Sequence, residues 1–225
     1  LLGDKVMAKK TMLKAKVPII EGTKKALKNK KHAIKVARKI GYPVIVKAAA
    51  GGGGKGMRIV KNIENLENAY DSAVAEAHLS FGDQTLYMEK YIEEPRHIEF
   101  QIIADQYRHV VHLGERDCSI QRKHQKLVEE SPSPALDEEL REKMGSVAVR
   151  AVSATKYEGA GTVEFLIDKN KNFYFMEMNT RIQVEHGVTE MVTGIDLVKE
   201  QIKLASGARL AFNQDNIKLD GWAIE

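Results

Sequence analysis

The chain has 225 residues, of which 43% are hydrophobic and 29% charged, a composition typical of a soluble globular protein with one large domain or two small ones. Its single cysteine, Cys118, excludes an internal disulfide framework and fits a reducing compartment. The sequence shows no signal peptide and no apolar run near the roughly 18 residues of a membrane helix.

The net charge of +4 is unevenly placed. Residues 1–61 hold 17 of the 35 lysines and arginines, against only Asp4 and Glu21. Such a segment indicates either a polyanionic partner or a solvated lysine-rich helical face. A nucleic-acid site would place aromatic side chains among the charges, and Tyr42 is the only aromatic residue of this stretch. A nucleotide phosphate is therefore the favoured polyanion.

Apolar spacing and helix stop signals predict the elements of the first 92 residues. Helices are predicted over 4–15, 32–40 and 64–79. Short strands are predicted over 44–47, 57–60 and 86–92. A run of glycines separates the first two of these strands.

The remaining residues predict more strands than helices. Residues 97–104 alternate apolar and polar side chains, which predicts a strand, with 109–114 as its hairpin partner. Residues 115–135 are polar and predict a long loop of the kind that is often functional. Beyond them, the sequence predicts a helix over 137–155 with Asp137 as its N-cap, a strand hairpin over 161–168 and 172–179, and a helix over 195–205.

These elements predict an α+β fold with antiparallel strands. Residues 19–92 form a basic lobe, residues 93–225 form a larger acidic lobe, and the helix within 1–18 packs on the larger lobe. The first residue is Leu rather than Met and the end at 221–225 alternates like a strand, so we expect a segment of a longer protein.

Two carboxylates face each other across the predicted C-terminal hairpin. If its turn is symmetric about residues 170 and 171, Glu164 lies directly opposite Glu177, with Cβ atoms about 5 Å apart. Asn179 lies on the same face, two residues beyond Glu177. Carboxylate and amide oxygens are the ligands that Mg²⁺ or Mn²⁺ prefers. The alternative is that both glutamates face water on an open sheet.

The glycine run Gly51–Gly54 is a stronger signal for nucleotide binding. Such a segment loses much backbone entropy on ordering but lets backbone N–H groups approach a phosphate closely. It matches neither the Walker nor the Rossmann pattern. Between two strands it predicts a flap over a triphosphate, with Lys47 as a phosphate contact. The alternative is a flexible linker.

A third cluster follows the second carboxylate strand. Within residues 181–186 the sequence places Arg181, which suits capture of a planar oxyanion, and Glu185, which suits a general base. Residues 115–126 also carry many hydrogen-bond donors. Taken singly, both segments are more typical of a solvated surface. Cys118 is interpreted as a packing residue, because no neighbour in the sequence would lower the pKa of its thiol.

Together these segments resemble the ATP-grasp core of biotin carboxylase, the family shared by acetyl-CoA, propionyl-CoA and pyruvate carboxylases. The resemblance covers nearly the whole chain. It rests on motifs that occur in the family's order, at Gly3–Lys5, Gly41–Lys47, Met88–Tyr91, Pro95–His97, Glu115–Gln125 and Glu177–His186. It implies an ATP-grasp fold with ATP between two lobes, residues 19–92 being a mobile lid. It also implies an ATP-dependent ligase that carboxylates biotin with bicarbonate.

The resemblance further implies roles for individual residues. Lys5 and Lys47 contact the ATP phosphates under a flap that includes Gly53 and Gly54. The other implied ATP contacts are Glu89, Lys90, Tyr91, Ile92, His97, Gln121, His124, Glu164, Leu166 and Glu177. Mg²⁺ or Mn²⁺ is bound by Glu164, Glu177 and Asn179. Bicarbonate is bound by Lys126, Arg181, Gln183, Val184 and Glu185. Of these, Lys126, Arg181 and Glu185 are catalytic, with Glu185 as the base and Arg181 stabilising the biotin enolate.

The implied partners are a biotin carboxyl carrier domain or protein and carboxyltransferase domains or subunits, with no nucleic acid and no membrane. The resemblance also implies a homodimeric parent in the cytoplasm, or in the mitochondrial matrix of a eukaryote, and a link to fatty acid biosynthesis. The family has further domains on both sides of this segment, so we expect the isolated segment to be monomeric, to bind ATP weakly and to turn over little. Ala50 and Gly187 depart from the family pattern, which usually has Gly and Pro there.

Three alternatives remain at this point. The first is another ATP-grasp ligase, such as half of a carbamoyl-phosphate synthetase, against which the Arg181–His186 string argues. The second is a nucleotide-binding module without turnover, against which the complete set of metal and base residues argues. The third is a basic nucleic-acid binder, which would show salt-dependent retention on DNA.

Overall fold

The computed structural model of the chain describes residues 5–50 and 56–225, with side chains from Met7 onward. The chain divides into two compact units. The larger combines the N-terminal residues up to Ile19 with Glu94–Arg122 and Lys126–Glu225, and the smaller consists of Ile20–Glu93 and Lys123–Gln125. Within the described ranges, no helix combines the length and the apolarity that crossing a bilayer requires.

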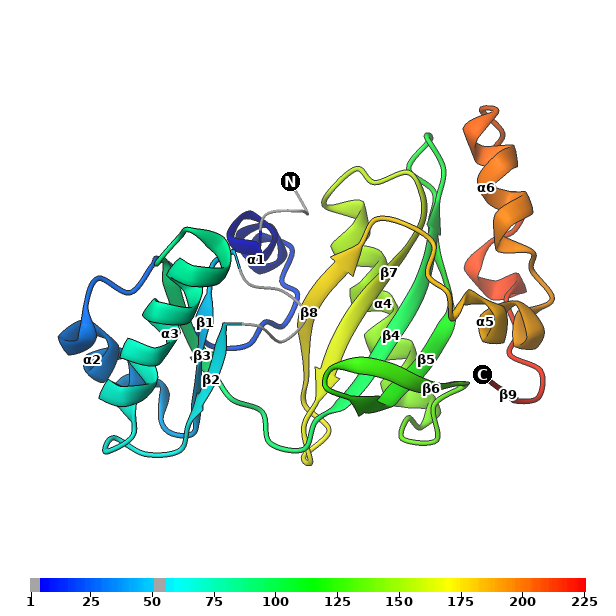
Figure 1. The fold of residues 1–225 in the computed structure, drawn as a ribbon. Helices are drawn as coiled ribbons and strands as arrows, with labels where there is room; N and C mark the ends of the chain where they lie inside the picture. Colours follow the sequence, from blue (N-terminus) through cyan, green and yellow to red (C-terminus); the bar gives the residue numbers. More distant parts are fainter. Residues whose placement is uncertain (1–4, 51–55) are drawn as a thin grey trace. The chain divides into compact units, whose positions relative to one another are not determined.

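The smaller unit is a three-stranded antiparallel sheet with two helices (Figure 1). Its strands are β1 (Val44–Ala48), β2 (Met57–Val60) and β3 (Leu86–Lys90), in the order β2-β1-β3. Its helices are α2 (Lys30–Ile40) and α3 (Leu66–Phe81). The pairing of Lys47 with Met57 confirms that strands flank the glycine run. The predicted flap, with Gly53 and Gly54, lies outside the described residues.

The larger unit is built on a six-stranded sheet in the order β8-β7-β4-β5-β6-β9. The strands are β4 (Arg96–Ala104), β5 (Val110–Arg122), β6 (Gln125–Ser131), β7 (Gly159–Ile167), β8 (Phe173–Asn179) and β9 (Ala223–Ile224). The helices are α1 (Lys5–Lys14), α4 (Glu138–Ser153), α5 (His186–Thr193) and α6 (Leu197–Ala205), with a 3-10 turn at Gln214–Asn216. The helix predicted over 137–155 is confirmed as α4, and the side chain of Asp137 caps it by accepting a hydrogen bond from Leu140 N.

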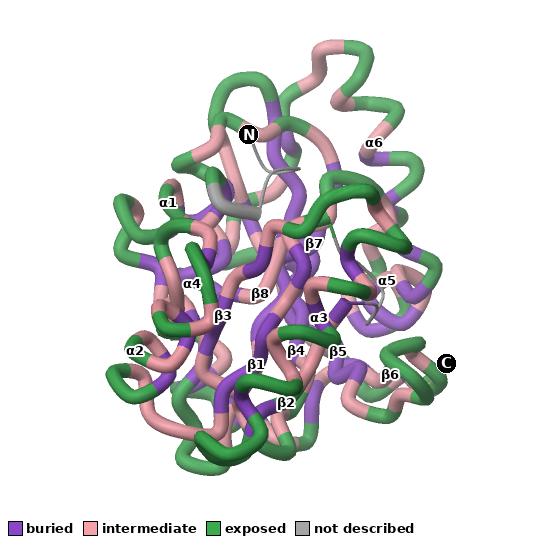
Figure 2. Tube along the Cα trace, turned by 60° about the vertical axis from the view of Figure 1, so that its left-hand side comes forward, coloured by how far each residue is buried: buried purple, intermediate pink, exposed green. Residues whose placement is uncertain are grey.

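One face of this sheet is apolar along its whole length. Ile98, Phe100 and Ile102 of β4 pack there with Phe165 of β7 and with apolar side chains of α4. Met12 of α1 joins the same cluster, and Phe175 N donates to Pro18 O at 2.8 Å. From Ile98 to Ala104 every residue of β4 is buried, and this part of the strand is drawn in purple in Figure 2.

The opposite face of the sheet is apolar at one end and polar at the other. At one end, Ile103 of β4 and Leu113 of β5 form an apolar cluster with Leu197 of α6. At the other end the same face carries polar side chains, because His97 and Glu99 alternate with Ile98 along β4. The alternation of β4 therefore puts a polar site on a sheet whose other face is a hydrophobic core.

The predicted loop over 115–135 is wrong. Residues up to Arg122 continue β5, and Gln125–Ser131 form β6. Glu115, Arg116 and Asp117 are buried because each pairs with an opposite charge, on Arg141, Glu99 and Arg96 in turn. The polar residues 115–117 are therefore buried charges with partners of opposite charge, and not exposed loop residues.

The C-terminal elements also differ from the expectation. The sequence predicts no helix at α5, whose N-cap residue Glu185 makes no side-chain capping bond. The helix predicted over 195–205 begins at Leu197, where Asp196 caps it by accepting from Lys199 N.

Candidate functional site

Four charged side chains lie in one row across the sheet of the larger unit. On β4, Glu99 is directly opposite Arg116 of β5 on one side and Glu164 of β7 on the other. Glu164 is in turn opposite Glu177 of β8. Like charges on directly opposed residues are destabilising, so three carboxylates in a row require cations beside them.

The pairing of Glu164 with Glu177 is confirmed, but the symmetric turn assumed for it is not present. Next to the turn, Phe165 pairs with Phe175, one residue out of the assumed register. An irregularity between Glu164 and Phe165 leaves Met176 without an opposite residue and restores the expected pairing at the glutamates. Such a bulge bends a strand and re-aims its side chains.

The exposed-sheet alternative is wrong for Glu164, which is 3% exposed. Glu177 is half-buried. Asn179 lies beside Glu164, with its Nδ2 donating to Oε1 at 2.6 Å. The hairpin therefore places Glu164 and Glu177 opposite each other with an amide beside them, as the sequence predicts, but Asn179 presents its NH₂ group to Glu164 rather than the predicted oxygen.

Lys126 supplies one of the cations that the row requires. Its Nζ donates to Glu99 Oε2 and to Glu185 Oε1, both at 2.5 Å, and to Glu164 Oε1 at 3.4 Å. Burial alone would lower the pKa of this ammonium, but the carboxylates of Glu99 and Glu164 raise the pKa well above its usual range. Lys126 is therefore charged at every physiological pH.

Glu164 is ionised although it is buried. Burial raises the pKa of this carboxyl, but His97 and Lys126 outweigh that effect and hold the pKa at about 2. Nε2 of His97 lies 3.0 Å from Oε2 of Glu164, and Gln183 Nε2 donates to Oε1 at 3.2 Å. On its other side, His97 Nδ1 lies 2.8 Å from Nε2 of Gln121.

Arg116 is the second cation of the row and is fully buried. Its Nε donates to Glu99 Oε1 at 2.6 Å, and its other donors reach side chains of β4, β7, α5 and the segment after β8. Burial raises the pKa of Glu99, but Arg116 and Lys126 reverse that effect and lower it. Glu99 is thus a buried carboxylate held between two cations.

The smaller unit carries a separate group of predicted residues. Lys47 of β1 donates to Glu89 Oε2 of β3 at 2.8 Å. Lys90 donates to the carbonyl oxygens of Gly41 and Tyr42, at 3.1 and 2.8 Å. Tyr91 and Ile92 follow β3 and are half-buried.

Several predicted residues are not drawn into the buried cluster. Arg181 is exposed, and its Nη1 donates to the neighbouring Ile182 O at 3.0 Å. Val184 is 83% exposed. His124 is exposed, with a φ of 65°, in the turn between β5 and β6. Leu166 is half-buried on β7. The side chain of Lys5 lies outside the described part of the chain.

Sequence reasoning missed the centre of the network. It assigned no role to Glu99, Gln101 or Arg116, which are all fully buried. The available signal was the polar series at alternate positions of β4, which continues from His97 through Glu99 to Gln101. Cys118 is buried, and burial together with Glu99 raises the pKa of its thiol, which fits the packing role predicted for it.

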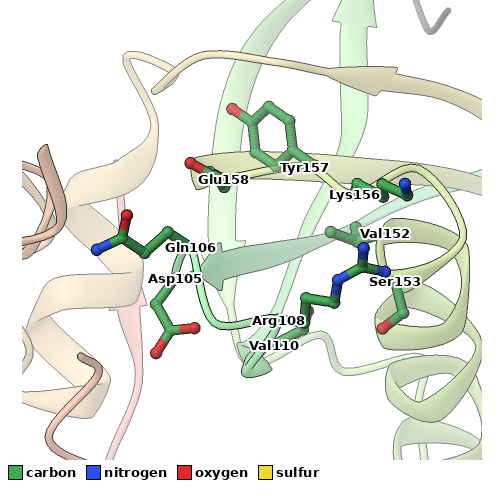
Figure 3. Close-up of a pocket in the computed structure, with 9 residues that line it drawn as sticks. All are labelled: Asp105, Gln106, Arg108, Val110, Val152, Ser153, Lys156, Tyr157 and Glu158. Carbon is green, nitrogen blue, oxygen red and sulfur yellow. The ribbon is translucent and has the colours of Figure 1, made fainter. Parts of the chain in front are cut away.

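A small hollow of about 120 Å³ lies elsewhere in the larger unit, between the β4–β5 turn and the end of α4 (Figure 3). It contains no residue predicted for the site. The Asp105 carboxylate in its wall already accepts from the backbone N–H groups of Tyr107, His109 and Leu210. That carboxylate therefore fixes the turn.

Comparison with known proteins gives both a family and close relatives. The matching family model is described as "Carbamoyl-phosphate synthase L chain, ATP binding domain" and covers residues 4–213. A biotin carboxylase of Nostoc sp. (strain PCC 7120) is 57% identical over 225 residues, which are all of this chain and 50% of that protein.

Solved structures agree with this similarity. The structure of a biotin carboxylase–β-γ-ATP complex from Campylobacter jejuni matches with a TM-score of 0.94 and 57% identity, over 100% of this chain and 50% of the other. The biotin carboxylase domain dimer of the 2-oxoglutarate carboxylase of Hydrogenobacter thermophilus, with MgADP, ADP and bicarbonate, matches with a TM-score of 0.93 and 53% identity, over 100% and 49%. The chain thus spans about half the length of these relatives.

Proposed function

This chain belongs to the family described as the carbamoyl-phosphate synthase L chain, ATP binding domain, and we propose that it is the ATP-binding core of a biotin carboxylase. In this function it forms carboxyphosphate from Mg-ATP and bicarbonate and carboxylates biotin. Similarity to biotin carboxylases over the whole chain supports the proposal, as does the ATP-grasp architecture of antiparallel sheets with helices.

One observation carries the proposal. The ammonium of Lys126 lies 2.5 Å from the carboxylate of Glu185, and both side chains are mostly buried. A cation beside a carboxylate can hold a small anion while that carboxylate takes its proton. This arrangement suits bicarbonate, which must bind as an anion and lose a proton to become a nucleophile.

The residues of the hairpin fit a divalent cation. Glu164 is ionised at neutral pH, Glu177 lies opposite it, and the amide of Asn179 can offer its oxygen after a flip. All three are the hard oxygen ligands that Mg²⁺ prefers. When bound, Mg²⁺ would offset the charge of the ATP phosphates.

A second group of donors fits the metal less well. Single ligand atoms of His97, Glu99 and Glu164 lie within 4.8 Å of one another. Each oxygen of Glu99 accepts from a cation, Arg116 at 2.6 Å and Lys126 at 2.5 Å, whereas Lys126 lies 3.4 Å from Glu164, so Glu99 is the poorer metal ligand. We therefore assign the metal to Glu164, Glu177 and Asn179.

The reaction follows from the roles of these side chains. Glu185 takes the proton of bicarbonate, whose oxygen attacks the γ-phosphorus of ATP as ADP leaves. Lys126 and Gln183 orient the anion before the attack. Carboxyphosphate then breaks down to CO₂ and phosphate. The phosphate takes the N–H proton of the ureido group of biotin, Arg181 stabilises the biotin enolate that results, and the ureido nitrogen attacks CO₂ to form carboxybiotin.

The remaining assignments extend the proposal to nucleotide and partners. Lys5 and Lys47 contact the ATP phosphates, and Glu89, Lys90 and Ile92 surround the adenine. His97 and Gln121, which are in contact with each other, lie near the ribose. The partners are a biotin carboxyl carrier and a carboxyltransferase, and the complete protein is a homodimer in the cytoplasm or the mitochondrial matrix.

The test is ATP hydrolysis by the complete protein that contains this chain. We expect hydrolysis to depend on bicarbonate and to increase with free biotin. The family description also favours a second candidate, a carbamoyl-phosphate synthetase. Stimulation by ammonia with no effect of biotin would establish that candidate and refute ours.

A further inference from the structure

Arg116 uses every hydrogen-bond donor of its side chain inside the protein. A guanidinium has five N–H groups in a fixed planar fork, and the residue is fully buried. The five acceptors, at 2.6 to 3.2 Å, are oxygens of Glu99, Gln101, Thr162, Gln183 and Thr189. A donor set this complete leaves the side chain no other orientation.

These acceptors belong to four separate segments. Glu99 and Gln101 are on β4, Thr162 is on β7, Gln183 follows β8, and Thr189 is on α5. Because the fork is rigid, Arg116 fixes these segments relative to one another. The segments are far apart in sequence, and their side chains meet at this one group.

The first connection runs through Glu99 to the proposed bicarbonate site. Glu99 accepts from Arg116 at Oε1 and from Lys126 at Oε2. One oxygen of the carboxylate is thus fixed by a rigid group and the other holds the ammonium. Lys126 in turn donates to Glu185, so the position of the base also depends on Glu99.

The second connection runs through Gln183. Its Oε1 accepts from Arg116 Nη2 at 3.1 Å, and its Nε2 donates to Glu164 at 3.2 Å. An amide held through its oxygen by a guanidinium must present its NH₂ group on the opposite side. Arg116 therefore decides that Gln183 offers donors, rather than an acceptor, to the site.

The third connection runs through α5. Arg116 Nη1 donates to Thr189 Oγ1 at 2.9 Å. Glu185 is the N-cap residue of this helix and makes no capping bond with its own side chain. The carboxylate of Glu185 is consequently oriented by Lys126 and by the placement of α5, both of which depend on Arg116.

We propose that Arg116 is the positioning residue of the bicarbonate site, acting on Lys126 through Glu99, directly on Gln183, and on Glu185 through α5. The inference rests on the proposed function. Arg116 acts only through these side chains. A lysine at the same position would keep the charge but not the five-donor fork.

The test is an Arg116→Lys variant of the complete protein, compared with Arg141→Lys. Arg141 is a matched control because it also pairs with a buried glutamate of β5, Glu115, through two bonds of 3.0 Å. For Arg116→Lys we expect kcat/KM for bicarbonate to fall about 100-fold, a loss that a displacement near 1 Å can produce. The Kd of a non-hydrolysable ATP analogue should stay within about twofold of wild type. For Arg141→Lys we expect thermal stability to fall and the bicarbonate parameters to remain unchanged.

The inference is overturned if Arg116→Lys keeps the bicarbonate parameters of the wild type, or loses nucleotide affinity to the same extent. If Arg116→Lys does not fold, Thr189→Val removes one acceptor without changing charge. For Thr189→Val we expect a smaller decrease, about tenfold, in kcat/KM for bicarbonate and no change in the Kd of the ATP analogue. A kcat/KM for bicarbonate equal to that of the wild type would overturn the inference. A wild-type protein without bicarbonate-dependent hydrolysis would refute the proposed function itself, and this inference with it.

Discussion

The ammonium nitrogen of Lys126 lies 2.5 Å from Oε1 of Glu185, which joins the start of β6 to the N-cap of α5. The same nitrogen also holds Glu99 and lies near Glu164. One side chain therefore compensates three carboxylates in a mostly buried site. Removing one partner of a buried ion pair leaves uncompensated charge, which costs about 3–5 kcal/mol.

Replacing Lys126 with methionine should therefore lower stability as well as activity. We expect the free energy of unfolding of Lys126→Met to fall by about 3 kcal/mol or more in urea denaturation. Lys199→Met is the control, since Lys199 is exposed and lies 3.7 Å from Asp196, and it should change stability by less than about 0.5 kcal/mol. Adding Glu185→Gln to Lys126→Met should recover part of the loss. A Lys126→Met protein as stable as the control would contradict the role of this ammonium.

The proposed role of Glu185 as the general base leads to a second prediction. In the complete protein, Glu185→Gln preserves size and keeps one oxygen that can accept from Lys126, but the amide cannot take a proton. We expect carboxylation to fall by roughly 10²–10⁴-fold, while calorimetry detects ATP binding close to that of the wild type. Glu190→Gln is the control, because Glu190 lies on α5 outside the Lys126 cluster. Unchanged carboxylation in Glu185→Gln would refute the base assignment.

The sequence predicts the hairpin of Glu164 and Glu177 because the pairing of its two strands depends only on residues close together in the chain. Two β-rich segments around one turn place Glu164 opposite Glu177 under a simple symmetry. The structure reaches this pairing through a bulge beside a turn in another register. The predicted pairing of Glu164 with Glu177 is correct although the assumed turn is not. The turn sets a register that differs by one residue from the assumed one, and the bulge shifts the register back by one residue.

Arg116 and the strand that carries it are not predictable by the same rules. Periodicity treats charged residues as exposed, so residues 115–117 suggest a loop. Their burial depends on Glu99, Arg141 and Arg96, which lie on β4 and α4 and become neighbours of residues 115–117 only when the chain folds. Helix α5 has no capping side chain, and its second residue is Gly187. The sequence around residue 186 therefore carries none of the usual signals for the start of a helix.

His112 predicts a dependence of stability on acid pH. Burial lowers its pKa from 6.5 to about 4, and Gly114 N donates to its Nδ1, which protonation would prevent. A depressed pKa means that the unfolded chain binds the proton first, so stability is present above pH 6.5 and is lost as pH falls towards 4. Between pH 7 and pH 5 we expect His112 to account for a loss of about 2 kcal/mol.

The measurement is urea denaturation of the wild type and of His112→Asn at both pH values. Asparagine can place an acceptor near the position of Nδ1, so the variant retains a partner for Gly114 N. We expect His112→Asn to lose less stability on acidification than the wild type. His109→Gln, on the same hairpin, should behave like the wild type. Equal acid sensitivity in His112→Asn and wild type would exclude His112 as the cause.

Two helical glycines should respond to alanine in opposite directions. At Gly187 in α5, an added Cβ would have no neighbour closer than Glu225 Oε2 at 3.8 Å, so Gly187→Ala should raise stability by about 0.5 kcal/mol through the reduced entropy of the unfolded chain. At Gly145 in α4, the Cβ would lie 2.3 Å from His112 Nε2. That imidazole cannot move freely, because its ring also packs edge-to-face on Phe100, 5.5 Å between centroids. Gly145→Ala should therefore lower stability by about 1–3 kcal/mol. Changes of the same sign in the two variants, measured by urea denaturation at pH 7, would contradict the packing of α4 against β5.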